Sequence, residues 1–178
     1  MEKITYEQYE RIQGEMVIEF LKNVTSKERH QLALGWNWDS NLNVLKWIIS
    51  DPDTDKATAL YIYWANGPRW HKQYANREEA MVENAGDISS FDLTEEIEKL
   101  FLSGFYKNHQ FAFDPTNDRG HNWTTEYFDK KIKKEIPDIM LKSLSGVEVQ
   151  YNELDENKDW EEGIPPCINK KMREFELI

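Results

Sequence analysis

Several aspartates in the first third of the chain could do acid–base chemistry. Two carboxylates that converge in a cleft can act as general acid and general base. Asp39 and Asp55, together with His71 or His121, are the candidates for such a site, which the fold would have to assemble. Aspartate is also a preferred helix N-cap, because its carboxylate accepts hydrogen bonds from the first backbone N–H groups. Capping accounts for Asp39 and Asp55, so we assign no catalytic residue and favour a protein that is not an enzyme.

The tryptophans offer a second kind of site. Indole rings stack on ligands and provide one N–H donor. Trp36 and Trp38 precede an expected helix and form the pair most suited to exposure, so with Asp39 and Asp55 they make an alternative ligand platform. Tryptophans at helical spacing are more often part of a core, and we expect that role for Trp64.

The sequence contains no motif for metal binding, for a catalytic nucleophile or for phosphate binding. The four histidines show no close pairing. The loop from Asp114 has Thr116 and Asp118 at calcium-loop spacing, but Arg119 stands where that loop needs glycine and Thr125 where it needs glutamate. No G-x-S-x-G or glycine-rich phosphate motif is present. We predict a structural turn at this loop, no metal site and no cofactor.

The charge of the chain argues against some partners and favours others. The formal net charge is −11, which disfavours nucleic acid and anionic membranes because both need clustered lysines and arginines. Residues 148–162 hold seven acids against one lysine. These acids form a predicted binding surface for a basic partner: Glu148, Glu153, Asp155, Glu156, Asp159, Glu161 and Glu162.

Length and composition predict the class of protein. With 178 residues and 13% aromatic side chains, we expect a single folded domain over 1–178, whose core is built from large rings. The single cysteine, Cys167, permits no intramolecular disulfide. No run of apolar residues is long enough to span a membrane, and the first residues do not resemble a signal peptide. Cytoplasmic localisation is the expectation.

Hydrophobic periodicity predicts a mainly α fold with six or seven short helices. A small strand pair near 147–151 is the most β structure that we expect. The central helices should form an antiparallel hairpin, with Asp39 or Ser40 capping the first helix and Thr54 or Asp55 the second. Helices are predicted over residues 6–24, from the cap Ser26 to Gly35, and over 40–50, 55–66, 92–105 and 124–136, with a last one after Pro165. The stretch 69–90 is expected to be mostly connection, in which residues 77–84 could form a short helix.

The central block carries a family resemblance. Trp36-Asn37-Trp38-Asp39 is followed by Leu45-x-Trp47-Ile48-Ile49, then by Pro52-x-x-Asp55, Thr58-Ala59-Leu60 and Trp64. In these spacings the block at about 30–66 resembles the bacterial DUF4274 domain. Departures are Ser40-Asn41 in place of Asp-Gly, Thr54 in place of Cys, and Ala57 in place of Gly. The resemblance implies a bacterial cytosolic protein, carries no known catalytic residues, and is loosely associated with toxin and immunity genes.

Three function hypotheses follow. The first is a binding protein of immunity type that neutralises a basic toxin, favoured by the charge, the acidic segment and the resemblance. The second is an enzyme with a site assembled from Asp and His. The third is a small-molecule or peptide sensor that uses exposed tryptophans. The first is the prediction that we carry forward.

Overall fold

The computed structural model describes residues 2–150 and 161–178, and the chain divides into two compact units. Unit 1 comprises residues 1–50 and 149–178, and unit 2 is the continuous segment 51–148. The mainly α prediction is confirmed, with eight α-helices among the described residues in place of the expected six or seven. Whether the units unfold together as the single domain predicted for 1–178 stays a prediction.

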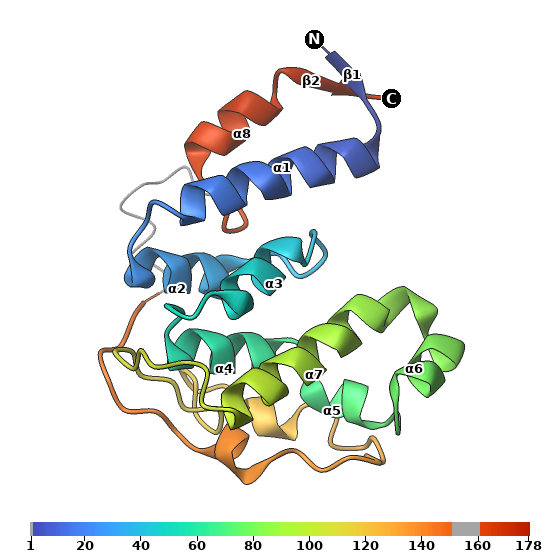
Figure 1. Cartoon of the computed structure of the whole chain (residues 1–178), viewed down its shortest axis with the longest axis vertical. Coiled ribbons are helices and arrows are strands. Elements are labelled where there is room, and N and C mark those ends of the chain that lie inside the picture. Colours follow the sequence, from blue (N-terminus) through green and yellow to red (C-terminus); the bar gives the residue numbers. More distant parts are fainter. Residues whose placement is uncertain (1, 151–160) are drawn as a thin grey trace. The chain divides into compact units, whose positions relative to one another are not determined.

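The described residues of unit 1 form four helices and a small sheet (Figure 1). In chain order they are β1 (Glu2–Ile4), α1 (Tyr6–Leu21), α2 (Ser26–Gly35), α3 (Asn43–Ser50), α8 (Pro166–Met172) and β2 (Phe175–Leu177). Helix α1 packs against α3 and α8, and α8 runs in the opposite direction to α1 (Figure 1). The core of this unit is aliphatic and includes Val17, Leu21, Leu32, Leu45, Ile48 and Met172.

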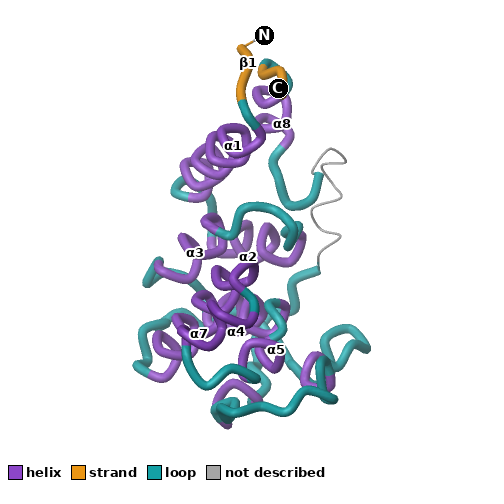
Figure 2. The backbone as a smooth tube through the Cα atoms, turned by 90° about the vertical axis from the view of Figure 1, so that its right-hand side faces the viewer, coloured by secondary structure: helices purple, strands orange, loops and turns teal. Residues whose placement is uncertain are grey.

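The sheet of unit 1 pairs the first strand with the last. β1 and β2 are parallel, with Lys3 opposite Glu176, and lie together at one end of the tube in Figure 2. The prediction of a strand pair near 147–151 is wrong for the described residues 147–150, where no strand is formed. Val147 makes only an isolated bridge to Phe111, because one pair of backbone hydrogen bonds does not extend into a ladder.

Unit 2 holds the other four helices. They are α4 (Lys56–Ala65), α5 (Pro68–Lys72), α6 (Arg77–Glu83) and α7 (Ile88–Leu102), with 3₁₀ turns at Ala85–Asp87, Trp123–Thr125 and Asp138–Leu141. Helix α4 lies against α7 and carries the rings at the centre of the core. Tyr63 and Trp64 meet edge to face at 5.5 Å, and Tyr61 meets Phe113 in the same way at 5.7 Å. The core role expected for Trp64 is confirmed, since its side chain is buried.

Helix starts follow local capping chemistry. Thr5 and Gln8 form a capping box at α1, and Thr25 and Glu28 form another at α2. Thr25, and not Ser26, caps α2 because its hydroxyl reaches the Glu28 N–H.

Two of the predicted caps in the central block have different outcomes. Asp55 caps α4 as expected, accepting the Ala57 N–H at 2.9 Å. Asp39 and Ser40 do not cap α3. Asn41 lies next to that helix and accepts the Asn43 N–H at 2.8 Å. The boundary between the units falls between α3 and α4, so the predicted hairpin stays a prediction.

Three further expectations about helices are wrong. The helix expected over 92–105 begins at Ile88, and Asp92 pairs with Arg77 of α6 at 2.7 Å instead of capping. The stretch from 69, expected to be mostly connection, contains α5, because Pro68 at the first helical position starts a new helix. The helix expected over 124–136 is only a 3₁₀ turn, because Tyr127 has a left-handed backbone with φ 52°.

Candidate functional site

Unit 1 contains a cleft of about 570 Å³ beside α1. Helix α1 supplies residues that share one face through spacings of three, four and seven: Tyr6, Tyr9, Glu10 and Gln13. The loop after α2 supplies Asn37, Asp39 and Ser40. The opposite wall is made of Glu161, Glu162, Ile164 and Asn169. We call this hollow the acidic cleft, because the described residues that line it include four carboxylates and no lysine or arginine.

A tight turn positions Glu161 and Glu162. Glu161 and Ile164 exchange backbone hydrogen bonds of 3.3 and 2.8 Å, and the two residues between them have left-handed φ values of 54° and 81°. Two left-handed central residues are typical of a type I′ turn. The second of them, Gly163, packs so closely on the end of α2 that a Cβ would lie 3.1 Å from the Leu32 carbonyl oxygen. Close packing therefore fixes the turn on unit 1.

Polar neighbours orient the carboxylates of the cleft. The Asn37 amide donates to Glu162 at 2.8 Å, and the other end of the same amide accepts the Asp39 N–H at 2.9 Å. Asn37 thus links the two walls of the cleft. Within the described part of the chain, the Glu161 carboxylate makes two long contacts, to the amide of Asn169 at 3.5 Å and to the Arg173 guanidinium at 3.9 Å. Its carboxylate is exposed and able to accept further hydrogen bonds.

The phenol of Tyr6 reports the negative potential of the cleft. A hydrogen bond to Glu10 and the charge of that carboxylate raise the pKa of Tyr6 above its usual value, and Asp39 adds to the effect. The same potential that disfavours a phenolate favours a bound cation. Carboxylates bind ammonium and guanidinium groups through charge-assisted hydrogen bonds, and tyrosine faces attract the same cations. The arrangement is therefore suited to binding a cationic group.

The predicted acidic surface is only partly described by the structure. Glu161 and Glu162 lie in the cleft, and Glu148 is exposed in unit 2. The other four predicted residues, Glu153, Asp155, Glu156 and Asp159, lie outside the described residues. Sequence reasoning missed the residues of α1 that line the cleft. Their common helical face was visible in the spacing, but the opposite wall lies about 150 positions away in the chain.

The tryptophan platform has not formed as expected. Trp36 is 6% exposed, so the prediction that it would be accessible is wrong; it follows α2 directly and is part of the core of unit 1. Trp38 is half-buried, and Asp39 is exposed in the acidic cleft. Asp55 lies in unit 2, is buried, and bonds the N–H groups of Ala57 and Gln110 with its two oxygens.

The residues of the catalytic alternative have separate partners. Asp55 uses both carboxylate oxygens to hold backbone N–H groups. His71 contacts the Asn66 carbonyl and Asp87, whereas His121 contacts Glu126 and the ring of Trp123. The part of the chain that the structure describes contains no group of three or more potential metal ligands.

The Asp114 loop is the structural turn that the sequence predicts. Asp114 accepts from both the N–H and the hydroxyl of Thr116, at 2.9 and 2.7 Å. Asp118 pairs with the backbone of His121 and accepts the Trp123 indole N–H at 3.0 Å. The oxygens of both aspartates thus hold the turn itself.

A buried ionic network lies at the centre of unit 2. Lys72 is 2% exposed, and its ammonium donates to Glu98 at 2.5 Å and to Glu95 at 3.2 Å. The Tyr63 hydroxyl donates to the other oxygen of Glu98 at 2.5 Å, and Lys134 donates to Glu95. Burial, and then the charge of Glu98, raise the pKa of Tyr63 far above its usual value. Two positive and two negative groups satisfy one another, which is typical of a structural network.

The segment that contains helices α2 to α7 matches a known family model. Residues 24–102 match the family described as "Domain of unknown function (DUF4274)". The resemblance predicted from the central block is thereby confirmed, over more residues than the 30–66 block. The DUF4274 match begins just before the cap of α2 and ends at the last residue of α7. Helix α1 and the segment 161–178 lie outside the match, and with them three of the four carboxylates of the acidic cleft, Glu10, Glu161 and Glu162.

Other comparisons give no further relatives. No curated protein and no solved structure matches the chain. None of the helices within 2–150 and 161–178 is long and apolar enough to cross a membrane.

Proposed function

We propose that this chain is a binding protein of immunity type, which neutralises a basic toxin enzyme by receiving a lysine or arginine side chain in the acidic cleft. The observation that carries the proposal is the lining of that cleft, in which four carboxylates and two tyrosines converge and no basic residue is found within 2–150 and 161–178. The net charge of −11 supports it, because a negative protein attracts a basic partner at long range.

Each wall of the cleft has a role in this proposal. Glu161, which has only weak contacts, accepts the hydrogen bonds of the incoming cation. The Glu162 carboxylate is already oriented by the Asn37 amide, so little side-chain freedom is lost when it binds, and Asn37 also holds the backbone of Asp39 at the opposite wall. Tyr6 is 62% exposed and offers a ring to the aliphatic part of the arriving side chain.

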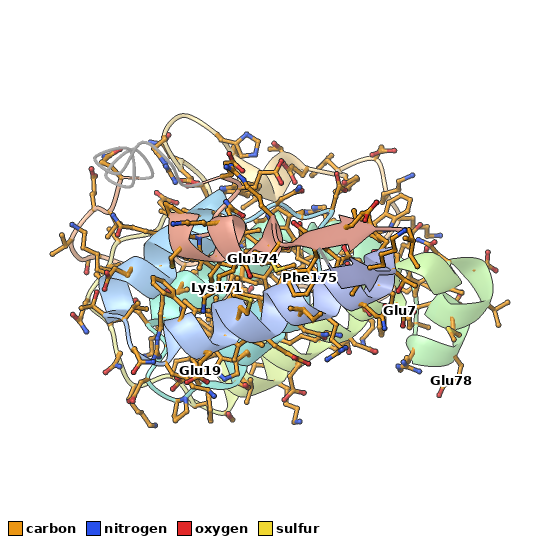
Figure 3. All side chains as sticks on the ribbon, turned by 90° about the horizontal axis from the view of Figure 1, so that it is seen from above. Glu7, Glu19, Glu78, Lys171, Glu174 and Phe175 are labelled. Atoms are coloured by element: carbon orange, nitrogen blue, oxygen red, sulfur yellow. The ribbon has the colours of Figure 1, made fainter. Side chains whose placement is uncertain are left out.

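The test compares two triple variants with the same change of charge. The first is Asp39→Asn, Glu161→Gln, Glu162→Gln in the cleft. The second is Glu78→Gln, Glu83→Gln, Glu135→Gln, at exposed positions of unit 2, of which Glu78 is labelled in Figure 3. The binding partner for the assay is the basic protein encoded beside this gene, and affinity is measured by calorimetry at several salt concentrations.

We expect the cleft variant to lose about 100-fold or more in affinity, since each tenfold loss corresponds to about 1.4 kcal/mol and three ion-pairing groups are removed. The control variant should lose about threefold, because it changes only the long-range field. The salt dependence of binding should flatten mainly in the cleft variant. Equal losses in the two variants, or no binding by any neighbouring product, would overturn the proposal.

A further inference from the structure

His71 of α5 is a buried titratable group that the proposed function does not use. Its side chain is 3% exposed. The ring nitrogen Nε2 lies 3.0 Å from the carbonyl oxygen of Asn66, the C-cap residue of α4. A carbonyl only accepts hydrogen bonds, so Nε2 carries the hydrogen of the neutral ring. This bond ties α5 to the end of α4.

The other ring nitrogen, Nδ1, has no hydrogen-bond partner among the described residues. The Asp87 carboxylate lies 3.7 Å away, which is too long for a hydrogen bond. That same oxygen already accepts the indole N–H of Trp70 at 2.9 Å. Nδ1 is therefore an unprotonated nitrogen, and a proton added to it would have no acceptor within hydrogen-bond distance among the described residues.

One aromatic ring and three charged residues surround the His71 ring. Phe91 of α7 meets the ring edge to face at 6.4 Å. Lys72 is the neighbouring residue on α5, Asp87 precedes α7, and Glu95 faces the ring from α7. Burial has the largest effect and lowers the pKa of His71, although Asp87 and Glu95 act in the opposite direction. The protonated ring is thus disfavoured in the closed structure.

We propose that His71 is an acid-sensitive latch. The neutral ring is buried between the end of α4 and Phe91 of α7, and a proton on Nδ1, which has no acceptor within hydrogen-bond distance among the described residues, loosens α5 and α6 from α7. The effect reaches α6 through a small apolar cluster beside the latch, in which Tyr74 and Ala80 pack on Phe91. The inference does not rest on the proposed function.

The direction of the effect follows from proton linkage. Opening exposes the ring to water, where its pKa is about 6.5. Because the pKa of His71 is lower in the closed state, the open state binds the proton more strongly, and acidification below about pH 6.5 favours opening. The opening equilibrium therefore grows by at most about tenfold per pH unit on acidification, until the pKa of the closed state is reached.

Hydrogen exchange of the backbone amides tests the latch. In the wild-type chain, protection of residues 68–83, corrected for intrinsic chemistry, should fall severalfold to tenfold between pH 7 and pH 5.5. In His71→Gln the fall should be absent, since the glutamine amide can still donate to Asn66 but does not titrate. In Asp87→Asn the fall should extend to lower pH, because a carboxylate that favours the protonated ring is removed.

Nitrogen NMR of the wild-type histidines provides a second test that needs no variant. At pH 7 the His71 ring should show hydrogen on Nε2 and none on Nδ1, and it should titrate below pH 6.5. A ring with hydrogen on Nδ1, unchanged protection of residues 68–83 in the wild type, or an equal loss in His71→Gln would overturn the proposal.

Discussion

The substitution Lys72→Met tests whether the ionic network of unit 2 is as buried as its geometry indicates. The Lys72 ammonium is 2% exposed and faces Glu98, whose side chain is 11% exposed. Methionine has a similar volume and no charge, so the variant leaves Glu98 with only the Tyr63 hydroxyl as a partner. Breaking a buried ion pair by removing one member costs about 3–5 kcal/mol. We expect a loss near the lower end of this range, because Glu95 keeps Lys134.

The double variant Lys72→Met, Glu98→Gln separates the ion pair from packing. The glutamine oxygen can still accept the Tyr63 hydroxyl, while no charge is left unpaired. The double variant should therefore be more stable than Lys72→Met alone, with a coupling of about 1–3 kcal/mol. The control is Lys99→Met, at an exposed position of α7. Its pair with Glu96 is exposed, so the change should be within about 0.5 kcal/mol.

The assay is urea unfolding followed by circular dichroism and by tryptophan fluorescence at pH 7. Coincidence of the two probes decides whether one free energy of unfolding describes the chain. A loss below about 1 kcal/mol in Lys72→Met, or a double variant less stable than the single one, would refute the reasoning.

Three further outcomes follow from single contacts. Gly67→Ala should cost more than Gly120→Ala, by about 1–3 kcal/mol in thermal unfolding, because both have a positive φ but only at Gly67 would a Cβ meet a ring atom at 2.8 Å; equal losses would contradict this. Asp55→Ala should cost about 2–4 kcal/mol, since it removes a cap and a buried acceptor; a loss below 1 kcal/mol would show that water replaces the carboxylate. Burial raises the pKa of Glu95, but the hydrogen bonds and charges of Lys134 and Lys72 outweigh this effect, so the pKa is lowered overall. The stability that Glu95 contributes is therefore present above about pH 4.3 and is lost as pH falls; the free energies of unfolding of wild type and Glu95→Gln should converge in acid.

The parts of the fold that the sequence predicted well are those in which local signals agree. Apolar spacing and a nearby cap located α1, α2 and α4 to within a few residues. Asp55 is the clearest case, since its type, its position before an apolar helix and its capping bond all agree. The family resemblance was visible because the aromatic and aspartate spacings occur together.

The parts that the sequence did not predict depend on distant contacts. Residues 124–136 have helical spacing, yet Lys133 and Lys134 donate their backbone N–H groups to the Lys72 carbonyl oxygen instead of continuing a helix. The burial of Trp36 and the composition of the acidic cleft depend on which loops meet. Local propensity does not contain that information.

The pairing of β1 with β2 has a consequence for biosynthesis. The ribosome finishes residues 51–148 before it adds α8 and β2, so unit 2 is complete while unit 1 still lacks the strand and helix that cover α1. Contacts between distant parts of a chain also form slowly, because a long loop has to close first. During synthesis, the face of α1 that packs against α8 therefore stays exposed to water until the last residues of unit 1 have been translated.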